Sequence, residues 1–249
     1  SRLEDLGVAF HFGEAANGWR EGGEGNTEIV VETEDEDGET REYPAETVLV
    51  AVGREPVTDT VNLDAVGLEP TEAGFLETDD QARTDAGHVF AVGDVAGEPM
   101  LAHEASAEGE VAAETIAGEV DSGTAGNDAP SLDDRAVPAA VFTDPEIGTV
   151  GLSEAEAAEA GFDPLVGEFP LRASGRALTL GETDGFVRVV ADGGSGVVLG
   201  GQVVAPEASE LIAEIGLAVE TGATVADVAD TIHTHPTLSE SGMEAAKNA

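Results

Sequence analysis

The sequence predicts an α/β chain whose second half is an α+β unit with an antiparallel sheet. Short apolar runs alternate with segments of helical periodicity, and tight turns join the runs beyond residue 129. Strands joined by tight turns and followed by helices favour an antiparallel sheet covered by helices. With 249 residues, of which 41% are hydrophobic, the chain is long enough to bury a core.

The first 56 residues contain three predicted strands. Apolar and β-branched residues at 29–33, the turn sequence DEDG at 35–38 and the residues that follow it predict a hairpin. The run TVLVAVG at 47–53 is continuously apolar and ends in Gly. That pattern is typical of a strand covered on both faces.

The next stretch predicts one short strand, one helix and a linker. The strand is expected at HVFAVGD (88–94), and the helix at LAHEASAEGEVAAETIAGE (101–119), where Ala and Ile recur at helical spacing. Residues 120–134 are rich in Gly, Ser, Asp and Pro. We therefore expect a linker there and a domain boundary near residue 128.

Beyond the linker the sequence predicts a sheet and several helices. Strands are expected at AAVFT (139–143), at IGTVGLS (147–153) and in a hairpin at 185–206. Helices are expected at 153–161, 206–222 and 224–233, and a last one begins within TLSESGMEAA (237–246). Ser153 and Glu156 have the spacing of a capping box, and Gly222 follows a helical pattern that starts with Pro.

The chain is strongly acidic. It has 52 Asp and Glu residues against 10 Lys and Arg residues, a formal net charge of −42. Phosphate contacts need a basic patch, so nucleic acid and anionic membrane surfaces are excluded as partners. No apolar run is long enough to span a membrane. The acidic residues are spread over periodic segments, which favours a folded cytoplasmic protein of a halophile over a disordered chain.

Two features that the sequence lacks limit the chemistry that this chain can perform. The sequence has no cysteine, which excludes disulfides, thiol nucleophiles and Cys-based metal sites within it. It opens with SRLEDLGVAF, which has neither Met nor the pattern of a signal peptide. We therefore expect this chain to be a piece of a longer protein.

The segment HTHPTLSE at 233–240 leaves three interpretations open. A metal site is the weakest, because no third type of ligand is apparent, and we predict no metal. Thr237 and Glu240 have the spacing of a capping box, so Glu240 can be a helix cap. His235 precedes Pro236, which favours a turn or extended conformation. A histidine is also the natural base near neutral pH, and a carboxylate on its other ring nitrogen would fix its tautomer.

Four segments, in this order, resemble the C-terminal half of the FAD-dependent pyridine nucleotide–disulfide oxidoreductases. They are VLVAVGREP (48–56), HVFAVGDVAGEPMLAHEASAEG (88–109), VFTDPEIGTVGLSEAEA (141–157) and HTHPTLSE (233–240). MLAHEA and HPTLSE are most similar to members of the family that oxidise dihydrolipoamide. The family's redox-active Cys pair and its two Gly-rich dinucleotide fingerprints are absent here. The resemblance therefore implies that roughly 200 further residues lie upstream, about one or two domains by size.

The resemblance implies three structural parts. Residues 1–56 would be the C-terminal end of an NAD-binding domain, 57–128 a return segment through the FAD domain, and 129–249 a dimerisation domain. The alternatives are a relative that acts on another disulfide or on mercuric ion, and an acidic oligomerisation module without activity.

The resemblance also implies the residues that bind the two cofactors. Asp94, after a predicted strand, would bind the ribityl chain of FAD. The alternative is that Asp94 only stabilises a turn and binds no cofactor. Gly53 would lie beside NAD. Four residues lead into a helix whose N-terminus would face the flavin ring: Met100, Leu101, Ala102 and His103. From the sequence alone, His103 is equally plausible as a buried, hydrogen-bonded histidine.

In the same resemblance, His235 is the base that removes a thiol proton from dihydrolipoamide, and Glu240 orients it. The thiolate, and not the thiol, attacks a disulfide. The base would come from one subunit and the disulfide from the other, so the partners expected are a second copy of the chain and dihydrolipoamide or a lipoyl-bearing protein. Nothing in the spacing gives His233 a carboxylate partner.

Overall fold

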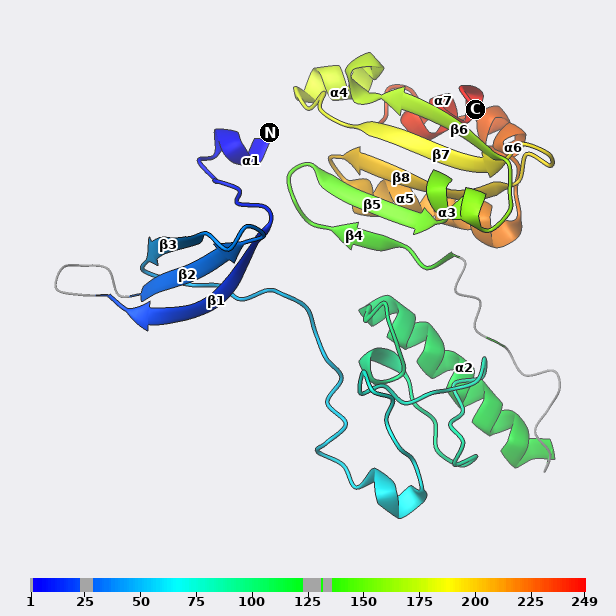
Figure 1. Cartoon of the computed structure of the whole chain (residues 1–249). Helices are drawn as coiled ribbons and strands as arrows, with labels where there is room; N and C mark the ends of the chain where they lie inside the picture. The colour runs from blue at the N-terminus through cyan, green and yellow to red at the C-terminus, as the bar shows by residue number, and fades with distance from the viewer. Residues whose placement is uncertain (1, 23–28, 123–130, 132–135) are drawn as a thin grey trace. The chain divides into compact units, whose positions relative to one another are not determined.

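The computed structural model describes residues 2–22, 29–122, 131 and 136–249 (Figure 1). The chain divides into two compact units, Ser1–Glu55 and Pro56–Ala249. The division of the sequence into the parts 1–56, 57–128 and 129–249 stays a prediction, and the boundary expected near residue 128 lies outside the described residues.

The first unit contains a three-stranded antiparallel sheet. Its strands β1 (Glu14–Glu21), β2 (Ile29–Asp35) and β3 (Thr40–Ala45) pair in that order, and the short helix α1 (Arg2–Asp5) precedes them. The predicted hairpin is confirmed as β2 and β3. Asp35 stabilises its turn, because Oδ1 accepts the N–H groups of Asp37 (3.1 Å) and Glu39 (2.9 Å). Strand β1 and helix α1 were not predicted.

The predicted buried strand at 47–53 is wrong. The segment forms no strand, and the side chains of Leu49, Val50 and Val52 are 88%, 73% and 92% exposed. A strand covered on both faces needs neighbouring strands and covering helices. Within the described residues, no strand pairs with this segment, so most of its apolar side chains stay exposed.

The second unit begins with turns and one long helix. The 3-10 helices η1 (Leu63–Val66) and η2 (Gly93–Val95) precede α2 (Ala102–Ser122), which confirms the helix predicted at 101–119. The strand predicted at 88–94 is wrong. Only an isolated bridge between Arg83 and Phe90 forms there, and Gly93 turns the chain with a φ of +74°. That conformation ends an extended run.

The rest of the second unit is an antiparallel sheet backed by helices (Figure 1). The five strands have the order β4-β5-β8-β7-β6. Their bounds are β4 Ala139–Val141, β5 Glu146–Gly151, β6 Pro164–Pro170, β7 Phe186–Asp192 and β8 Val198–Ala205. The predicted strands after residue 138 and the hairpin of β7 and β8 are confirmed, whereas β6 was not predicted. The antiparallel sheet predicted for this half is confirmed as well.

Within residues 139–249, all of which the structure describes, five α-helices and one 3-10 helix accompany this sheet. They are α3 (Glu154–Glu159), η4 (Leu171–Ala173), α4 (Gly175–Leu180), α5 (Ala208–Thr221), α6 (Val225–Asp230) and α7 (Glu240–Lys247). Four were predicted, while η4 and α4 were not. The capping box of α3 is confirmed by reciprocal bonds between Ser153 and Glu156, and α5 ends at Gly222 in a left-handed conformation.

Helix α5 packs closely on β5 and β8 because two glycines leave room for it. A Cβ at Gly148 would lie 2.7 Å from the carbonyl oxygen of Ala208, and one at Gly201 would lie 2.9 Å from the side chain of Ile215. The same helix lacks a side-chain cap of its own. Instead, Glu146 of β5 accepts the backbone N–H (3.0 Å) and the hydroxyl (2.8 Å) of Ser209.

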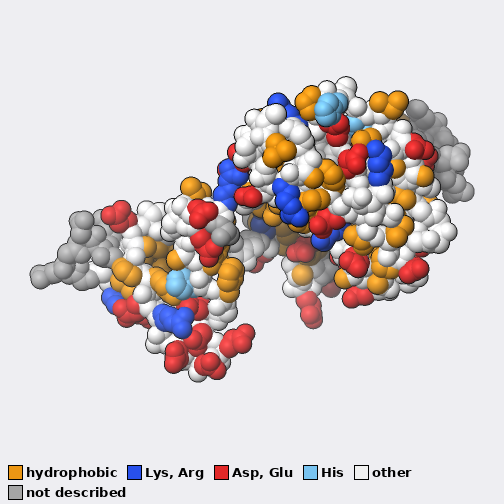
Figure 2. Space-filling model, turned by 90° about the horizontal axis from the view of Figure 1, so that it is seen from above, with side chains coloured by type: hydrophobic (Ala, Val, Ile, Leu, Met, Phe, Trp, Pro, Cys, Tyr) orange, Lys and Arg blue, Asp and Glu red, His pale blue; other side chains and the backbone are white. Residues whose placement is uncertain are grey.

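The core of the second unit lies between this sheet and its helices. Helix α5 packs against β5 and β8, and α7 packs against β6 and β7. The largest fully buried apolar side chains are Leu171, Val187, Val189, Val190, Val198, Val203 and Ile212. No helix among the described residues is both long enough and apolar enough to cross a membrane. Figure 2 shows carboxylates scattered over the face in view, with Lys and Arg side chains among them.

Candidate catalytic dyad and cofactor-binding residues

The candidate catalytic residues are His235, in the segment that joins α6 to α7, and Glu240, the first residue of α7. Leu238 anchors this segment, because its side chain packs against the core of the second unit. The peptide bond between His235 and Pro236 is cis. With Leu238 packed inward and His235 exposed, the segment runs over the surface of the core to the start of α7 at Glu240.

The structure brings His235 and Glu240 together, and we call them the His235–Glu240 dyad. Nδ1 of His235 lies 2.8 Å from Oε1 of Glu240, and the histidine side chain is 78% exposed. An ionised carboxylate only accepts hydrogen bonds, so Nδ1 carries a proton. No described group bonds to Nε2 of His235, which in the neutral ring keeps its lone pair toward solvent.

Glu240 also accepts a second hydrogen bond, from the backbone N–H of Thr237 at 2.8 Å. This bond, followed by the bond from His235 and the charges of both histidines, lowers the pKa of the Glu240 carboxyl. The expected capping box is only half formed. Thr237 donates its hydroxyl to the carbonyl of Thr234, and α7 begins at Glu240 with Ser239 before it. Pairing and capping thus coexist at one carboxylate.

His233 has a carboxylate partner, although the spacing of the sequence around it gave none. Its Nε2 lies 2.8 Å and 3.0 Å from the two carboxylate oxygens of Glu214 on α5, and its side chain is 7% exposed. Its Nδ1 lies 2.8 Å from the carbonyl oxygen of Thr231. The partner lies 19 residues upstream, where only the packing of α5 brings it close. Local spacing contains no signal for such a pair.

The pKa of His233 is raised above its ordinary value by these neighbours. Burial lowers it, but the bonds to Glu214 and Thr231 and the charges of Glu214 and Glu240 outweigh burial. Among the described residues, no group of three or more His, Asp or Glu side chains is placed to hold a metal ion.

The candidate FAD-binding residues lie in η2 and at the start of α2. Asp94 is exposed, within η2. The backbone N–H of the preceding Gly93 bonds to the carboxylate of Glu108 on α2, which ties this turn to the helix. No feature of the sequence singled out Glu108. Met100 and Leu101 are half-buried where the chain enters α2.

Ala102 and His103 form the exposed first turn of α2. His103 is therefore not the buried histidine that the sequence left open, but it is hydrogen-bonded, because its Nε2 lies 2.6 Å from the carbonyl oxygen of Pro138. Gly53 belongs to the first unit. It has a φ of +131°, and no atom lies within 4 Å of the position that a Cβ would take.

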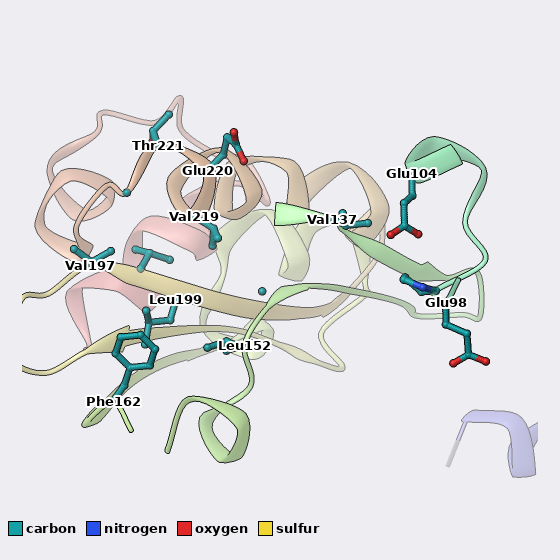
Figure 3. A pocket seen from close by; sticks show the side chains of 14 residues that line it. Glu98, Glu104, Val137, Leu152, Phe162, Val197, Leu199, Val219, Glu220 and Thr221 are labelled. Carbon is teal, nitrogen blue, oxygen red and sulfur yellow. The ribbon is translucent and has the colours of Figure 1, made fainter. Parts of the chain in front are cut away.

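A pocket of about 580 Å³ lies in the second unit (Figure 3). Its lining is mainly apolar, from strands and helices that include β8 and the end of α5, and carboxylates stand at its rim. The apolar side chains labelled in Figure 3 are Val137, Leu152, Phe162, Val197, Leu199 and Val219, and the carboxylates are Glu98, Glu104 and Glu220. Neither residue of the dyad lines this pocket.

The fold agrees with comparisons to known proteins. Residues 1–109 match the pyridine nucleotide-disulphide oxidoreductases, and residues 137–246 match the dimerisation domain of the same family. The chain belongs to the pyridine nucleotide-disulphide oxidoreductases.

Individual relatives give a more specific comparison than the family does. The chain is 65% identical over 248 residues to the dihydrolipoyl dehydrogenase of Halobacterium salinarum and 61% identical over 249 residues to that of Haloferax volcanii. Each match covers 100% of this chain and 50% of the relative. The crystal structure of LpdA from Mycobacterium tuberculosis is 32% identical, with a TM-score of 0.83 over 99% of this chain and 50% of that one. The chain thus spans about half the length of the curated relatives it matches.

Proposed function

We propose that this chain is the base-carrying part of a homodimeric dihydrolipoyl dehydrogenase that uses FAD and NAD in the cytoplasm of a halophile. The observation that carries the proposal is the His235–Glu240 dyad. It places an imidazole with an unoccupied Nε2 at the surface and fixes its other nitrogen with a carboxylate. The identity to halophilic dihydrolipoyl dehydrogenases supports the substrate, and the match to a dimerisation domain supports the homodimer.

In this proposal His235 acts as a general base. Nε2 takes the proton of a dihydrolipoamide thiol, and the resulting thiolate attacks a disulfide sulfur, releasing the other sulfur of that disulfide as a thiolate. The disulfide must come from outside these 249 residues, because they contain no cysteine. Glu240 holds the proton on Nδ1 and stabilises the imidazolium that forms.

The cofactor-binding residues fit the same proposal. The first turn of α2, at Ala102 and His103, is exposed at the positive end of a 21-residue helix, where it would favour negative charge on a flavin ring. The exposed carboxylate of Asp94 would accept hydrogen bonds from ribityl hydroxyls. Gly53 has open space above its Cα, which would let NAD approach the backbone. When bound, the two cofactors would accept the electrons of the dithiol in turn.

Replacing His235 in the full-length enzyme tests the proposal. His235→Gln is expected to lower dihydrolipoamide turnover by about 10² to 10⁴, the range for losing a general base. FAD content and the reduction of an artificial dye by NADH should survive, because neither needs a thiol proton removed. His88→Gln is the matched control, since His88 is exposed and lies in the loop before η2. Full lipoamide turnover in His235→Gln, or an equal loss of dye reduction, would refute the role of His235.

A further inference from the structure

We infer that the buried ring of His233 and the half-exposed carboxylate of Glu214 form an ion pair that positions the His235–Glu240 dyad, an inference that rests on the proposed function. Both ring nitrogens of His233 face acceptors. The carbonyl oxygen of Thr231 lies 2.8 Å from Nδ1, and the carboxylate of Glu214 lies 2.8 Å from Nε2. A carbonyl and a carboxylate only accept hydrogen bonds, so both nitrogens carry protons and the ring is an imidazolium.

The two histidines of this segment therefore differ in protonation state and in role. His233 is 7% exposed and uses both nitrogens inside the protein, whereas His235 is 78% exposed and uses only Nδ1. The buried ring fixes the backbone two residues before the exposed one. The charge of His233 also acts on Glu240, where it adds to the effects that lower the pKa of that carboxyl.

The support for this pair extends into the rigid part of the fold. Glu214 precedes Ile215, which is 3% exposed and packs against Gly201 of β8. Helix α5 lies close against the sheet at Gly148 and Gly201, where a Cβ would clash with it. The backbone that carries Glu214 is therefore well packed. The bond from His233 to Glu214 ties the segment between α6 and α7 to this helix.

The direction of the pKa shift sets the pH range in which the pair works. The charged groups that act on the His233 ring are Glu214 from α5 and Glu240 from α7, and α6 ends next to the carbonyl of Thr231. The pKa of His233 is raised above its unfolded value of about 6.5. The pair therefore stabilises the segment fully below that pH, and this contribution is lost as the pH rises through the folded-state pKa.

The experiment compares Glu214→Gln with Glu210→Gln in the full-length holoenzyme. Both changes remove one carboxylate from α5, but Glu210 lies one turn earlier and is exposed, whereas Glu214 is the carboxylate that faces Nε2 of His233. In Glu214→Gln, kcat for dihydrolipoamide is expected to fall about tenfold, while dye reduction by NADH should stay unchanged. The His235 ring would be displaced, so it would still act as a base but in poorer geometry. The double variant with His233→Gln should lose no more than the larger of the two single variants, as coupled residues do.

A second readout is independent of turnover. Titration of ¹³C-labelled histidines by NMR, assigned with His233→Gln, should show that His233 loses its proton at a lower pH in Glu214→Gln than in the wild type and in Glu210→Gln. An unchanged titration, or a loss of kcat no greater than in Glu210→Gln, overturns the inference. If Glu214→Gln does not fold, the titration of His233 in the wild type tests the inference instead. A pKa of His233 at or below the ordinary value for histidine would show that the ion pair does not form. Full dihydrolipoamide turnover in His235→Gln would instead refute the proposed function. The titration of His233 would still test whether His233 and Glu214 form an ion pair.

Discussion

Replacing Glu240 with Gln should impair catalysis because Glu240 accepts two hydrogen bonds from two donors. The N–H of Thr237 bonds to Oε2, and Nδ1 of His235 bonds to Oε1, both at 2.8 Å. Gln offers one acceptor oxygen and one NH₂ group. If the oxygen stays with Thr237, the NH₂ group faces Nδ1 and the ring proton moves to Nε2. The ring then presents a donor where a base is needed.

The expected loss of turnover in Glu240→Gln depends on how exposed the His235 side chain is. Removing the orienting carboxylate of a buried catalytic histidine lowers kcat by about 10⁴ in the serine protease triad. His235 is 78% exposed, so water competes for its Nδ1 proton and the wrong tautomer is less strongly enforced. We therefore expect Glu240→Gln to lower dihydrolipoamide turnover by about 10- to 100-fold, less than His235→Gln.

The assay is steady-state turnover of dihydrolipoamide by the full-length enzyme, with dye reduction by NADH measured in parallel. Glu244→Gln is the matched control, because Glu244 lies one turn further along α7 and pairs with Lys247 on the surface. Wild-type turnover in Glu240→Gln, or a loss shared with Glu244→Gln or with dye reduction, would show that Glu240 does not control the state of His235.

Two predictions concern stability. With a formal net charge of −42, the melting temperature should rise steeply as KCl is raised from about 0.1 to 2 M, because salt screens the repulsion between carboxylates; a flat curve in differential scanning calorimetry would contradict the halophilic interpretation. Glu146→Ala should lower the free energy of unfolding by about 1 kcal/mol, because Glu146 caps α5 through Ser209. These bonds lower the pKa of Glu146, so its contribution is present above its unfolded pKa, and the difference from wild type should vanish as pH falls through the folded-state pKa. Denaturant titrations that show the same difference at acidic pH would rule out the carboxylate as the cap.

The sequence was most informative where structure depends on neighbours along the chain. The turn at Asp35 and the capping box of Ser153 were predictable, because each satisfies its hydrogen bonds within four residues. The pairing of His235 with Glu240 spans only five residues and has the same local character.

Prediction failed where structure depends on distant parts of the fold. The run at 47–53 is apolar, but a strand also needs partners, which composition does not reveal. Strand β6 was missed because Pro164 and Pro170 bound it, and proline normally argues against a strand. The sheet places β6 at an edge, where proline is tolerated. The bond between His233 and Glu214 joins two elements that only the finished fold brings together.

The exposed run at 47–53 has a consequence for producing these 249 residues as a separate protein. Its peptide groups and its apolar side chains on both faces form an open template for pairing with another chain. Glu46 and Arg54 flank it, and charges at such places oppose self-association. Salt weakens that opposition while it supports folding, and it strengthens apolar association. We therefore expect an optimum salt concentration for purification, above which the folded protein associates through this segment.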